Sequence, residues 1–285
     1  MQTRALIVGG TGGIGYAIAR HLAANASSTV IISGRTRPQN IPHANIKFRQ
    51  LDASSMRLIK QYTESYKSSH APKIDLLVLT QGILTTAGRT ETSEGIDRKM
   101  ALHYYGRQLL IRELLPVLTD DAKVLIVLDG SRGDPAQLNM ADLDLSANFS
   151  IANAAAHCIS MTDGMIQAYA KQQAKENTKK RHFIHAYPGI VKTELFGSLP
   201  WYLRAPTRVF SQILGITSEE CATNLLTGLV EVSAMNEKDG KFWSCIDSKG
   251  SLIENKPTWT ADQIQQVQEH TWKIVDTAVT SSSSE

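Results

Sequence analysis

The sequence Gly9-Gly10-Thr11-Gly12-Gly13-Ile14-Gly15 lies directly between a short apolar run, residues 5–8, and a helical pattern that continues to about residue 25. Glycines at this density allow a tight turn and let phosphates approach the backbone closely. The helix behind them offers unpaired N–H groups and the positive end of its dipole to the same phosphates. A glycine-rich run alone is a weak indication, but its place between a strand and a helix predicts a dinucleotide-binding loop.

Strand and helix patterns alternate outward from this loop. Short apolar strands separated by helices indicate a parallel sheet that is covered on both faces, and right-handed crossovers favour a doubly wound topology. We therefore expect an α/β fold of the Rossmann type, with one domain over residues 1–280, a substrate lid at 190–216 and a disordered tail at 281–285. The expected strands are 5–8, 30–33, 46–51, 74–80, 123–128 and 182–187, and the expected helices are 14–25, 55–66, 95–118, 154–176 and 218–232.

The composition excludes several classes of protein. Hydrophobic residues make up 42% of the chain and charged residues 20%, and the net charge is only +3 without a basic block, so we expect no nucleic-acid partner. The apolar runs have the length of strands, which predicts no transmembrane span. The three cysteines show no metal-ligand spacing, so we expect no metal site, and they suit a reducing compartment such as the cytoplasm.

The second strand carries a signal for the choice of cofactor. An NAD-selecting loop needs a carboxylate about 20 residues further on, to bind the ribose 2′-hydroxyl. No acidic residue occurs from position 16 through 51, and the strand ends instead in Ser33-Gly34-Arg35, with Arg37 close by. The planar guanidinium of Arg35 suits a 2′-phosphate, although either arginine could be a solvated loop charge. The sequence thus favours NADP(H) over NAD(H).

These features resemble the short-chain dehydrogenase/reductase family over nearly the full chain. Within the family, the stretch 94–118 and the long final helix are most similar to the retinol-dehydrogenase-like branch, a look that many fungal biosynthetic reductases share. The family spacing G-x-x-x-G-x-G is matched, an aspartate follows the third strand, and a P-G…T element follows the sixth. The resemblance implies that NADP(H) is contacted by Gly9, Thr11, Gly12, Gly13, Ile14, Gly15, Arg35, Asp52, Gly82, Pro188, Gly189 and Thr193.

The catalytic residues of the family are mostly replaced. The family uses asparagine, serine and a Y-x-x-x-K pair, and this chain contains no Y-x-x-x-K. The asparagine position corresponds to His103 and the serine to Ser131, whereas the tyrosine and lysine positions correspond to His157 and Met161. Because a free histidine titrates near pH 6.5, His157 can donate a proton near neutrality without a neighbouring lysine. The resemblance therefore implies a catalytic set of His157, Ser131 and His103.

Other interpretations of these positions stay open. His157 could be a satisfied, half-buried helix residue, and His103 could support the site or simply belong to its helix. Met161 is expected to line the substrate pocket or to fill the core. Arg132 and Asp163 are alternative polar candidates, which could instead form ion pairs.

The segment after Thr193 is apolar and aromatic. Phe196, Trp201 and Tyr202 follow the P-G…T element, where the resemblance places the substrate lid. Such a lid suits a hydrophobic small molecule. The same segment could be a packed helical hairpin, an oligomer surface or a membrane-facing patch. Dimers and tetramers are common in the family, so a homo-oligomer is also an expectation.

Three functions fit the sequence. The first is an NADPH-dependent oxidoreductase that acts on a hydrophobic carbonyl, imine or activated alkene, in keeping with specialised-metabolite biosynthesis. The second is a non-redox isomerase, cyclase or dehydratase in which His103 and His157 move protons. The third is a non-catalytic NADP(H)-binding sensor, which needs an intact cofactor loop and tolerates a degraded catalytic set.

Overall fold

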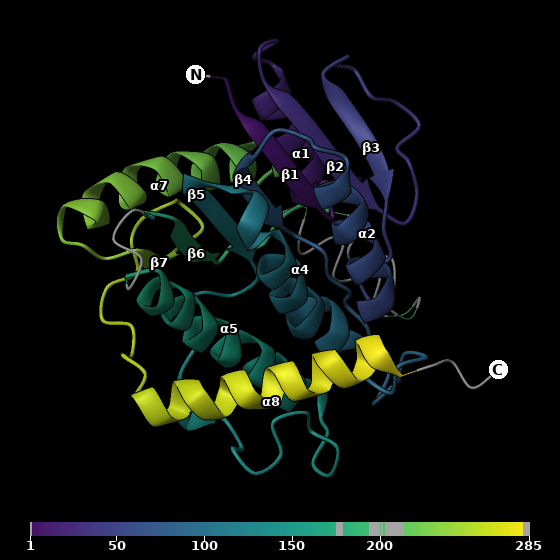
Figure 1. Cartoon of the computed structure of the whole chain (residues 1–285), viewed down its shortest axis with the longest axis vertical. Helices are drawn as coiled ribbons and strands as arrows, with labels where there is room; N and C mark the ends of the chain where they lie inside the picture. The colour runs from purple at the N-terminus through teal and green to yellow at the C-terminus, as the bar shows by residue number, and fades with distance from the viewer. Residues whose placement is uncertain are drawn as a thin grey trace.

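A single parallel sheet of seven strands forms the centre of the protein (Figure 1). The computed structural model describes residues 2–174, 179–193, 200, 202, 212 and 214–281. The strand order is β3-β2-β1-β4-β5-β6-β7, and every neighbouring pair is parallel. This confirms the doubly wound Rossmann-type fold. The strands are β1 (Arg4–Val8), β2 (Thr29–Gly34), β3 (Ile46–Gln50), β4 (Ile74–Leu79), β5 (Leu118–Val127), β6 (His182–Ala186) and β7 (Trp243–Ile246).

Helices cover both faces of the sheet, because alternate strand residues point into two separate apolar cores. One core joins the sheet to α1 (Gly13–Ala23) and α7 (Ser218–Lys238), which pack against each other. The other joins it to α2 (Met56–Ser68), α4 (Gly106–Leu114) and α5 (Ile151–Gln173). The strands β1 and β4 at the centre of the sheet are buried on both sides, which explains why their sequences are almost continuously apolar.

The helix α8 (Ala261–Thr280) forms an additional layer outside α2 and α5, and it runs across them in Figure 1. It begins at a capping box, in which Thr260 and Gln263 each bond the other's backbone N–H. Two hydrogen bonds attach its middle to the helices below. The hydroxyl of Tyr104 lies 2.6 Å from Thr271 Oγ1, and that of Tyr105 lies 2.9 Å from His270 Nε2.

The helical stretch before β5 is less regular than the sequence predicts. In place of one helix over 95–118, it consists of α3 (Arg98–Met100), a π-helical turn η1 (Ala101–Tyr105), α4 and a short 3-10 turn η2 (Leu115–Val117). The π turn carries His103 and faces the carboxyl end of the sheet through Leu102, and such turns often accompany functional sites. A second 3-10 turn, η3 (Pro135–Gln137), lies in the loop after β5.

Three further segments were either not predicted or cannot be compared with the prediction: β7, the lid and the tail. The strand β7 is absent from the sequence prediction, since its four residues leave no clear alternation. Most of the expected lid, including Phe196 and Trp201, lies outside the described residues, as do residues 282–285 of the expected tail.

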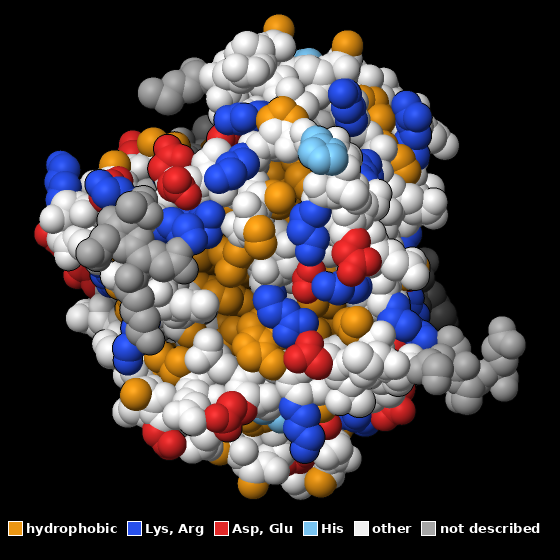
Figure 2. Space-filling view, viewed as in Figure 1, with side chains coloured by type: hydrophobic (Ala, Val, Ile, Leu, Met, Phe, Trp, Pro, Cys, Tyr) orange, Lys and Arg blue, Asp and Glu red, His pale blue; other side chains and the backbone are white. Residues whose placement is uncertain are grey.

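Along the described part of the chain, no helix is both long enough and apolar enough to cross a membrane. On the face shown in Figure 2, acidic and basic side chains intermingle around a hollow where hydrophobic side chains gather.

Candidate cofactor and active site

A groove of about 320 Å³ lies at the carboxyl ends of β1, β2 and β4. In a parallel doubly wound sheet this edge is where ligands bind. The groove contains ten of the twelve residues that the sequence assigns to the cofactor, among them the whole stretch from Thr11 to Gly15. Its full lining is Val8, Gly9, Thr11, Gly12, Gly13, Ile14, Gly15, Arg35, Leu51, Asp52, Ala53, Ser54, Thr80, Gln81, Gly82, Ile83, Arg98, Leu102 and Thr193.

The glycine loop has no room for side chains at its key positions. Gly9 has a φ of +82°, and a Cβ there would lie 2.5 Å from the backbone nitrogen of Gln81. A Cβ at Gly15 would collide with the Thr80 hydroxyl and with the carbonyl of Gly9. Gly12, in contrast, has open space beside it. The loop therefore presents bare backbone to the groove immediately before α1, as a pyrophosphate requires.

Two charged residues define one end of the groove. The Asp52 carboxylate accepts hydrogen bonds from the Ser54 backbone nitrogen at 3.0 Å and from the Ser54 hydroxyl at 2.6 Å. Burial favours the neutral acid, but these bonds and the charges of Arg35 and Arg98 outweigh it and lower the pKa of Asp52. Arg35 is exposed on the rim, whereas Arg37 does not line the groove. An ionised acceptor and an exposed guanidinium thus stand together at the adenosine end that the resemblance implies.

The opposite end is formed by the segment after β6. Thr193 lines the groove and lies next to Gly13, where a Cβ would be 3.2 Å from its methyl group. Pro188 and Gly189, also expected to contact the cofactor, are not part of the groove lining. Gly189 has a φ of +72° and packs against Ser248, so a tight turn after β6 accounts for this glycine.

A buried amide beside the groove has no partner. Gln81 is 6% exposed, and neither its Oε1 nor its Nε2 has a hydrogen-bond partner among the described residues. An unpaired buried amide is costly, and such groups are commonly completed by a ligand or water. With the glycine cradle and the Arg35–Asp52 end, this orphaned amide makes the groove a fitting site for a dinucleotide.

His103 lies directly beneath the groove wall. Its Nε2 accepts a hydrogen bond from the Ile83 backbone nitrogen at 3.0 Å and would be 2.9 Å from a Cβ at Gly82. Burial, assisted by the Arg107 charge, lowers the pKa of His103 to about 3. The imidazole is therefore neutral at physiological pH. It supports the Gly82–Ile83 backbone, and its groove-side nitrogen is already an acceptor.

His157 does not have the free nitrogen that a proton donor requires. Its Nδ1 donates to the Leu143 carbonyl and its Nε2 accepts from the Asn139 backbone nitrogen, each at 3.1 Å. The side chain is 2% exposed, and burial outweighs the Leu143 carbonyl and the Asp142 charge to lower its pKa. His157 thus has a structural role in place of the expected acid/base role, because α5 directs its side chain toward the loop at 139–143 and not into the groove.

Met161 and three aromatic residues are the remaining residues that the sequence assigns to the substrate pocket. Met161 is fully buried in the core between the sheet and α5, so the expectation that it lines the substrate pocket is wrong. Of the expected lid aromatics, only Tyr202 falls within the described residues, and it is 59% exposed. Phe196 and Trp201 are not described.

Ser131 lies on a loop, residues 129–134, at the carboxyl end of β5. Its hydroxyl donates to Asp129 Oδ1 at 2.5 Å, and Arg132 Nε lies 2.6 Å from Asp129 Oδ2. Ser131 and Arg132 are both exposed. Because β5 stands between β4 and β6, this loop occupies the sheet edge between Gly82 and Pro188. It offers a hydroxyl and a guanidinium at the place where the resemblance puts the substrate.

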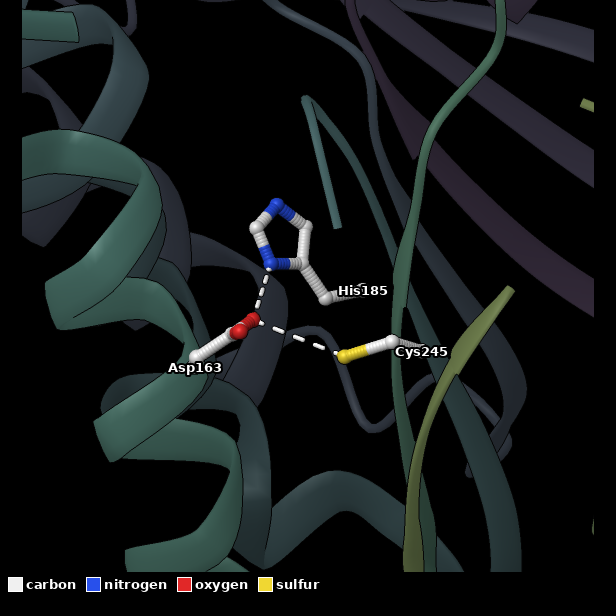
Figure 3. A group of neighbouring side chains, drawn as sticks. All are labelled: Asp163, His185 and Cys245. Carbon is white, nitrogen blue, oxygen red and sulfur yellow. Dashed lines mark hydrogen bonds and ion pairs between the residues drawn. The ribbon is translucent and has the colours of Figure 1, made fainter. Parts of the chain in front are cut away.

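A buried charged cluster, Asp163–His185–Lys256, holds this loop from below. Figure 3 shows the Asp163–His185 pair together with Cys245. Asp163 Oδ1 lies 2.6 Å from His185 Nδ1, and its Oδ2 lies 2.7 Å from Lys256 Nζ. His185 Nε2 accepts from the Asp129 backbone nitrogen at 3.2 Å, and Lys256 Nζ donates to the Gly133 carbonyl at 2.8 Å. The cluster thus fixes both ends of the loop and leaves its middle, with Ser131 and Arg132, facing outward.

The same cluster includes Cys245, and the donor atoms of Asp163, His185 and Cys245 lie within 4.8 Å of one another. Such a set can suggest a metal site, but its atoms are already committed. Cys245 Sγ donates to Asp163 Oδ1 at 3.5 Å, both His185 nitrogens are bonded, and the Lys256 ammonium neutralises the carboxylate. Burial raises the pKa of the Cys245 thiol, which disfavours the thiolate that a metal needs. Hydrogen bonding accounts for the cluster without an ion.

Sequence reasoning missed several residues of this site. Arg98, Ser54 and Gln81 line the groove, and Asp129, His185 and Lys256 support its neighbouring loop. Two of them leave a signal in the sequence. Asp52-Ala53-Ser54 has the spacing of an Asx turn, and His185 lies inside a strand whose other residues, apart from His182 at its start, are apolar. Lys256 gives no such signal, because its partner is far away in the chain.

Comparison with known proteins shows which family the chain is similar to. The family described as short chain dehydrogenase matches residues 3–134, which include the glycine loop, Arg35, Asp52 and Ser131. An oxidoreductase of Emericella nidulans is 37% identical over 224 residues, covering 74% of this chain and 64% of that protein. Human polyprenol dehydrogenase is 27% identical over 235 residues, covering 76% and 69%. The chain spans just under two thirds of the length of the first relatives it matches.

The fold also recurs in solved structures. A carbonyl reductase from chicken fatty liver superimposes with a TM-score of 0.60 at 18% identity, covering 88% of this chain and 98% of the other. At this identity the likeness concerns the fold alone. The sequence matches, the glycine cradle and the position of the groove together lead to one conclusion: the chain belongs to the short-chain dehydrogenase/reductase family.

Proposed function

We propose that this protein is an NADP(H)-dependent oxidoreductase that acts on a hydrophobic carbonyl, imine or activated alkene. The observation that carries the proposal is the groove, in which the glycine loop, Arg35, Asp52 and Thr193 meet. Arg35 supports NADP(H) over NAD(H), because no acidic side chain stands at the end of β2 to take a ribose 2′-hydroxyl.

The names of relatives support the class of reaction. Several fungal relatives are described as oxidoreductases, including one of Emericella variicolor that is 29% identical over 206 residues. Human polyprenol dehydrogenase bears a name that refers to a long apolar alcohol. A hydrophobic substrate and a role in fungal specialised metabolism follow as parts of the proposal.

The loop after β5 supplies the polar groups for the substrate. Bound NADPH would provide hydride to the substrate carbon. Ser131 Oγ–H, turned away from Asp129, would donate a hydrogen bond to the substrate oxygen or nitrogen. The Arg132 guanidinium would offset the negative charge that develops there, and water would supply the proton. The buried cluster beneath holds both ends of the loop that carries these side chains in place.

A second function is favoured by the positions of His157 and Met161. Both stand where the family places its proton donor and lysine, and both serve the core or a loop instead. This arrangement suits a protein that binds NADP(H) without turnover. It makes a different prediction, namely tight dinucleotide binding with no conversion of any substrate.

Titration of the purified protein with NADPH and NADH tests the cofactor assignment. We expect NADPH to bind more tightly, and Arg35→Ala to weaken NADPH binding roughly 10- to 100-fold while leaving NADH nearly unaffected, since a charge-assisted bond is removed. Arg37→Ala is the matched control, because it removes an equally exposed arginine outside the groove. Equal affinities for the two dinucleotides in wild type would refute the NADP assignment.

Consumption of NADPH with a panel of hydrophobic ketones, imines and enones tests the chemistry. With the best substrate, Ser131→Ala and Arg132→Leu should each lower kcat about tenfold or more, whereas Ser27→Ala, at the far end of β2, should not. Binding without conversion across the panel would favour the second function.

A further inference from the structure

Arg107, at the start of α4, is a fully buried guanidinium close to the groove. It is 1% exposed, and all its hydrogen bonds go to backbone carbonyls. Nη1 donates to Val127 O at 2.8 Å and Nη2 to Gln81 O at 2.5 Å, with a weaker bond from Nε to Leu102 O at 3.4 Å. It therefore joins the carboxyl ends of β4 and β5 to the π turn, directly behind the wall that Gln81 and Leu102 form.

The positive charge of Arg107 has no counter-ion among the described residues. No carboxylate there forms an ion pair with it, and Asp97, which acts on neighbouring His103, is itself paired with Lys99 at 3.2 Å. The thiol of Cys158 is close, but burial raises its pKa to about 12, so it is neutral. Burial lowers the pKa of Arg107 to about 9, which still leaves it protonated at pH 7.

Keeping an unpaired charge inside a protein is unfavourable, and two strand ends could be joined by a neutral side chain. The charge itself therefore acts on whatever occupies the groove on the other side of the wall formed by Gln81 and Leu102. We propose that Arg107 is a positioning residue whose fixed charge makes this protein bind the reduced dinucleotide, NADPH, more tightly than the oxidised form, NADP⁺. The inference rests on the proposed function, because it concerns the same groove.

The physical reason lies in the charge difference between the two forms. Their phosphates are identical and are attracted to Arg107 equally, whereas the nicotinamide ring is cationic in NADP⁺ and neutral in NADPH. A buried cation behind the groove wall would disfavour the cationic, oxidised ring and leave the neutral ring unaffected. The ratio of the two dissociation constants therefore isolates the effect of Arg107 on the ring from its effect on the phosphates.

The test measures the dissociation constants of NADPH and NADP⁺ by calorimetry, without turnover, for wild type, Arg107→Lys and Arg107→Gln. Lysine keeps the charge with fewer hydrogen bonds, and glutamine keeps hydrogen-bonding capacity without the charge. We expect NADP⁺ to bind roughly tenfold more weakly than NADPH in wild type. Arg107→Lys should retain this ratio and Arg107→Gln should bring it close to one. Thermal unfolding shows that each variant is folded.

The outcomes separate this inference from the proposed function. If wild type binds neither NADPH nor NADP⁺, the proposed function fails. If both bind and the ratio is unchanged in Arg107→Gln, or falls equally in both variants, then Arg107 only joins the strand ends and the inference is overturned. If a variant does not fold, the ratio in wild type still decides, because equal affinities contradict the inference.

Discussion

Gly133 rests against the buried carboxylate of Asp163 with no space for a side chain between them, since a Cβ at position 133 would collide with Oδ2. Asp163 is 1% exposed, so the carboxylate cannot turn out to solvent. The loop that carries Ser131 is thus seated on a charged group of the core. Its position depends on one glycine as much as on the cluster below it.

Replacement of this glycine should displace the loop. We expect Gly133→Ala to lower the free energy of unfolding by about 1–3 kcal/mol, as overpacking against a fixed group does. Denaturant unfolding measures this change. Gly88→Ala is the control, because a Cβ at Gly88 meets nothing within 4 Å. Equal stability of the two variants would mean that the loop is not seated on Asp163.

Removal of Lys256 should be more damaging than removal of the whole ion pair. Lys256→Met leaves the Asp163 charge buried without its cation, which costs about 3–5 kcal/mol. The double variant Asp163→Asn/Lys256→Met is expected to recover part of that loss, since no charge remains. A double-mutant cycle from urea unfolding gives the coupling energy. Additive effects of the two substitutions would contradict a buried ion pair. Arg20→Ala is the control: it breaks an exposed pair with Glu219 and should change the free energy of unfolding by less than 1 kcal/mol.

His157 should matter for stability and not for cofactor binding. His157→Phe leaves the Asn139 N–H and the Leu143 carbonyl without partners, and we expect a loss of about 2–4 kcal/mol. The dissociation constant of NADPH should stay within about twofold. Unfolding and binding titrations check the two parts. Full stability combined with lost turnover would instead restore a catalytic role for His157.

Buried neutral histidines should make the protein sensitive to mild acid. Burial lowers the pKa of His103 to about 3 and, together with the Lys123 charge, that of His182 to about 4. In the unfolded chain both take up protons below about pH 6.5, so stability should fall from there toward pH 4, by about 1.4 kcal/mol per pH unit for each histidine. His103→Gln keeps an acceptor for Ile83 and should reduce this slope, whereas His21→Gln, at an exposed site, should not. An unchanged slope would show that His103 is not buried neutral.

The unpaired amide of Gln81 predicts opposite effects on stability and binding. Gln81→Leu removes two unsatisfied buried atoms, so the ligand-free protein should be as stable as wild type or more stable by about 1–2 kcal/mol. If a dinucleotide satisfies the amide, the same change should weaken NADPH binding several-fold. Thermal unfolding with and without NADPH measures both. A destabilised ligand-free variant with normal affinity would contradict the assignment.

Features that are determined by residues close together in the chain could be predicted from the sequence. The glycine loop, the ends of most strands and the groove residues from Gly9 to Asp52 depend on neighbours in the chain. The role of His157 could not be predicted, because it depends on how α5 is rotated about its axis. The apolar neighbours Leu109 and Leu110 hint that Arg107 is buried. Its carbonyl partners lie at the carboxyl ends of β4 and β5, far away in the sequence, so they can be identified only in the folded structure.

The outer position of α8 has a consequence for the order in which the protein is made. The ribosome releases this helix after the sheet and the helices beneath it, yet the hydroxyl groups of Tyr104 and Tyr105 bond to Thr271 and His270 of α8. Until residues 261–280 emerge, the apolar side chains that α8 covers stay exposed in the nascent chain, while the groove at the carboxyl edge of the sheet can already form. Synthesis thus separates the assembly of the groove from the closing of the core, and this interval is where a chaperone would be of most use.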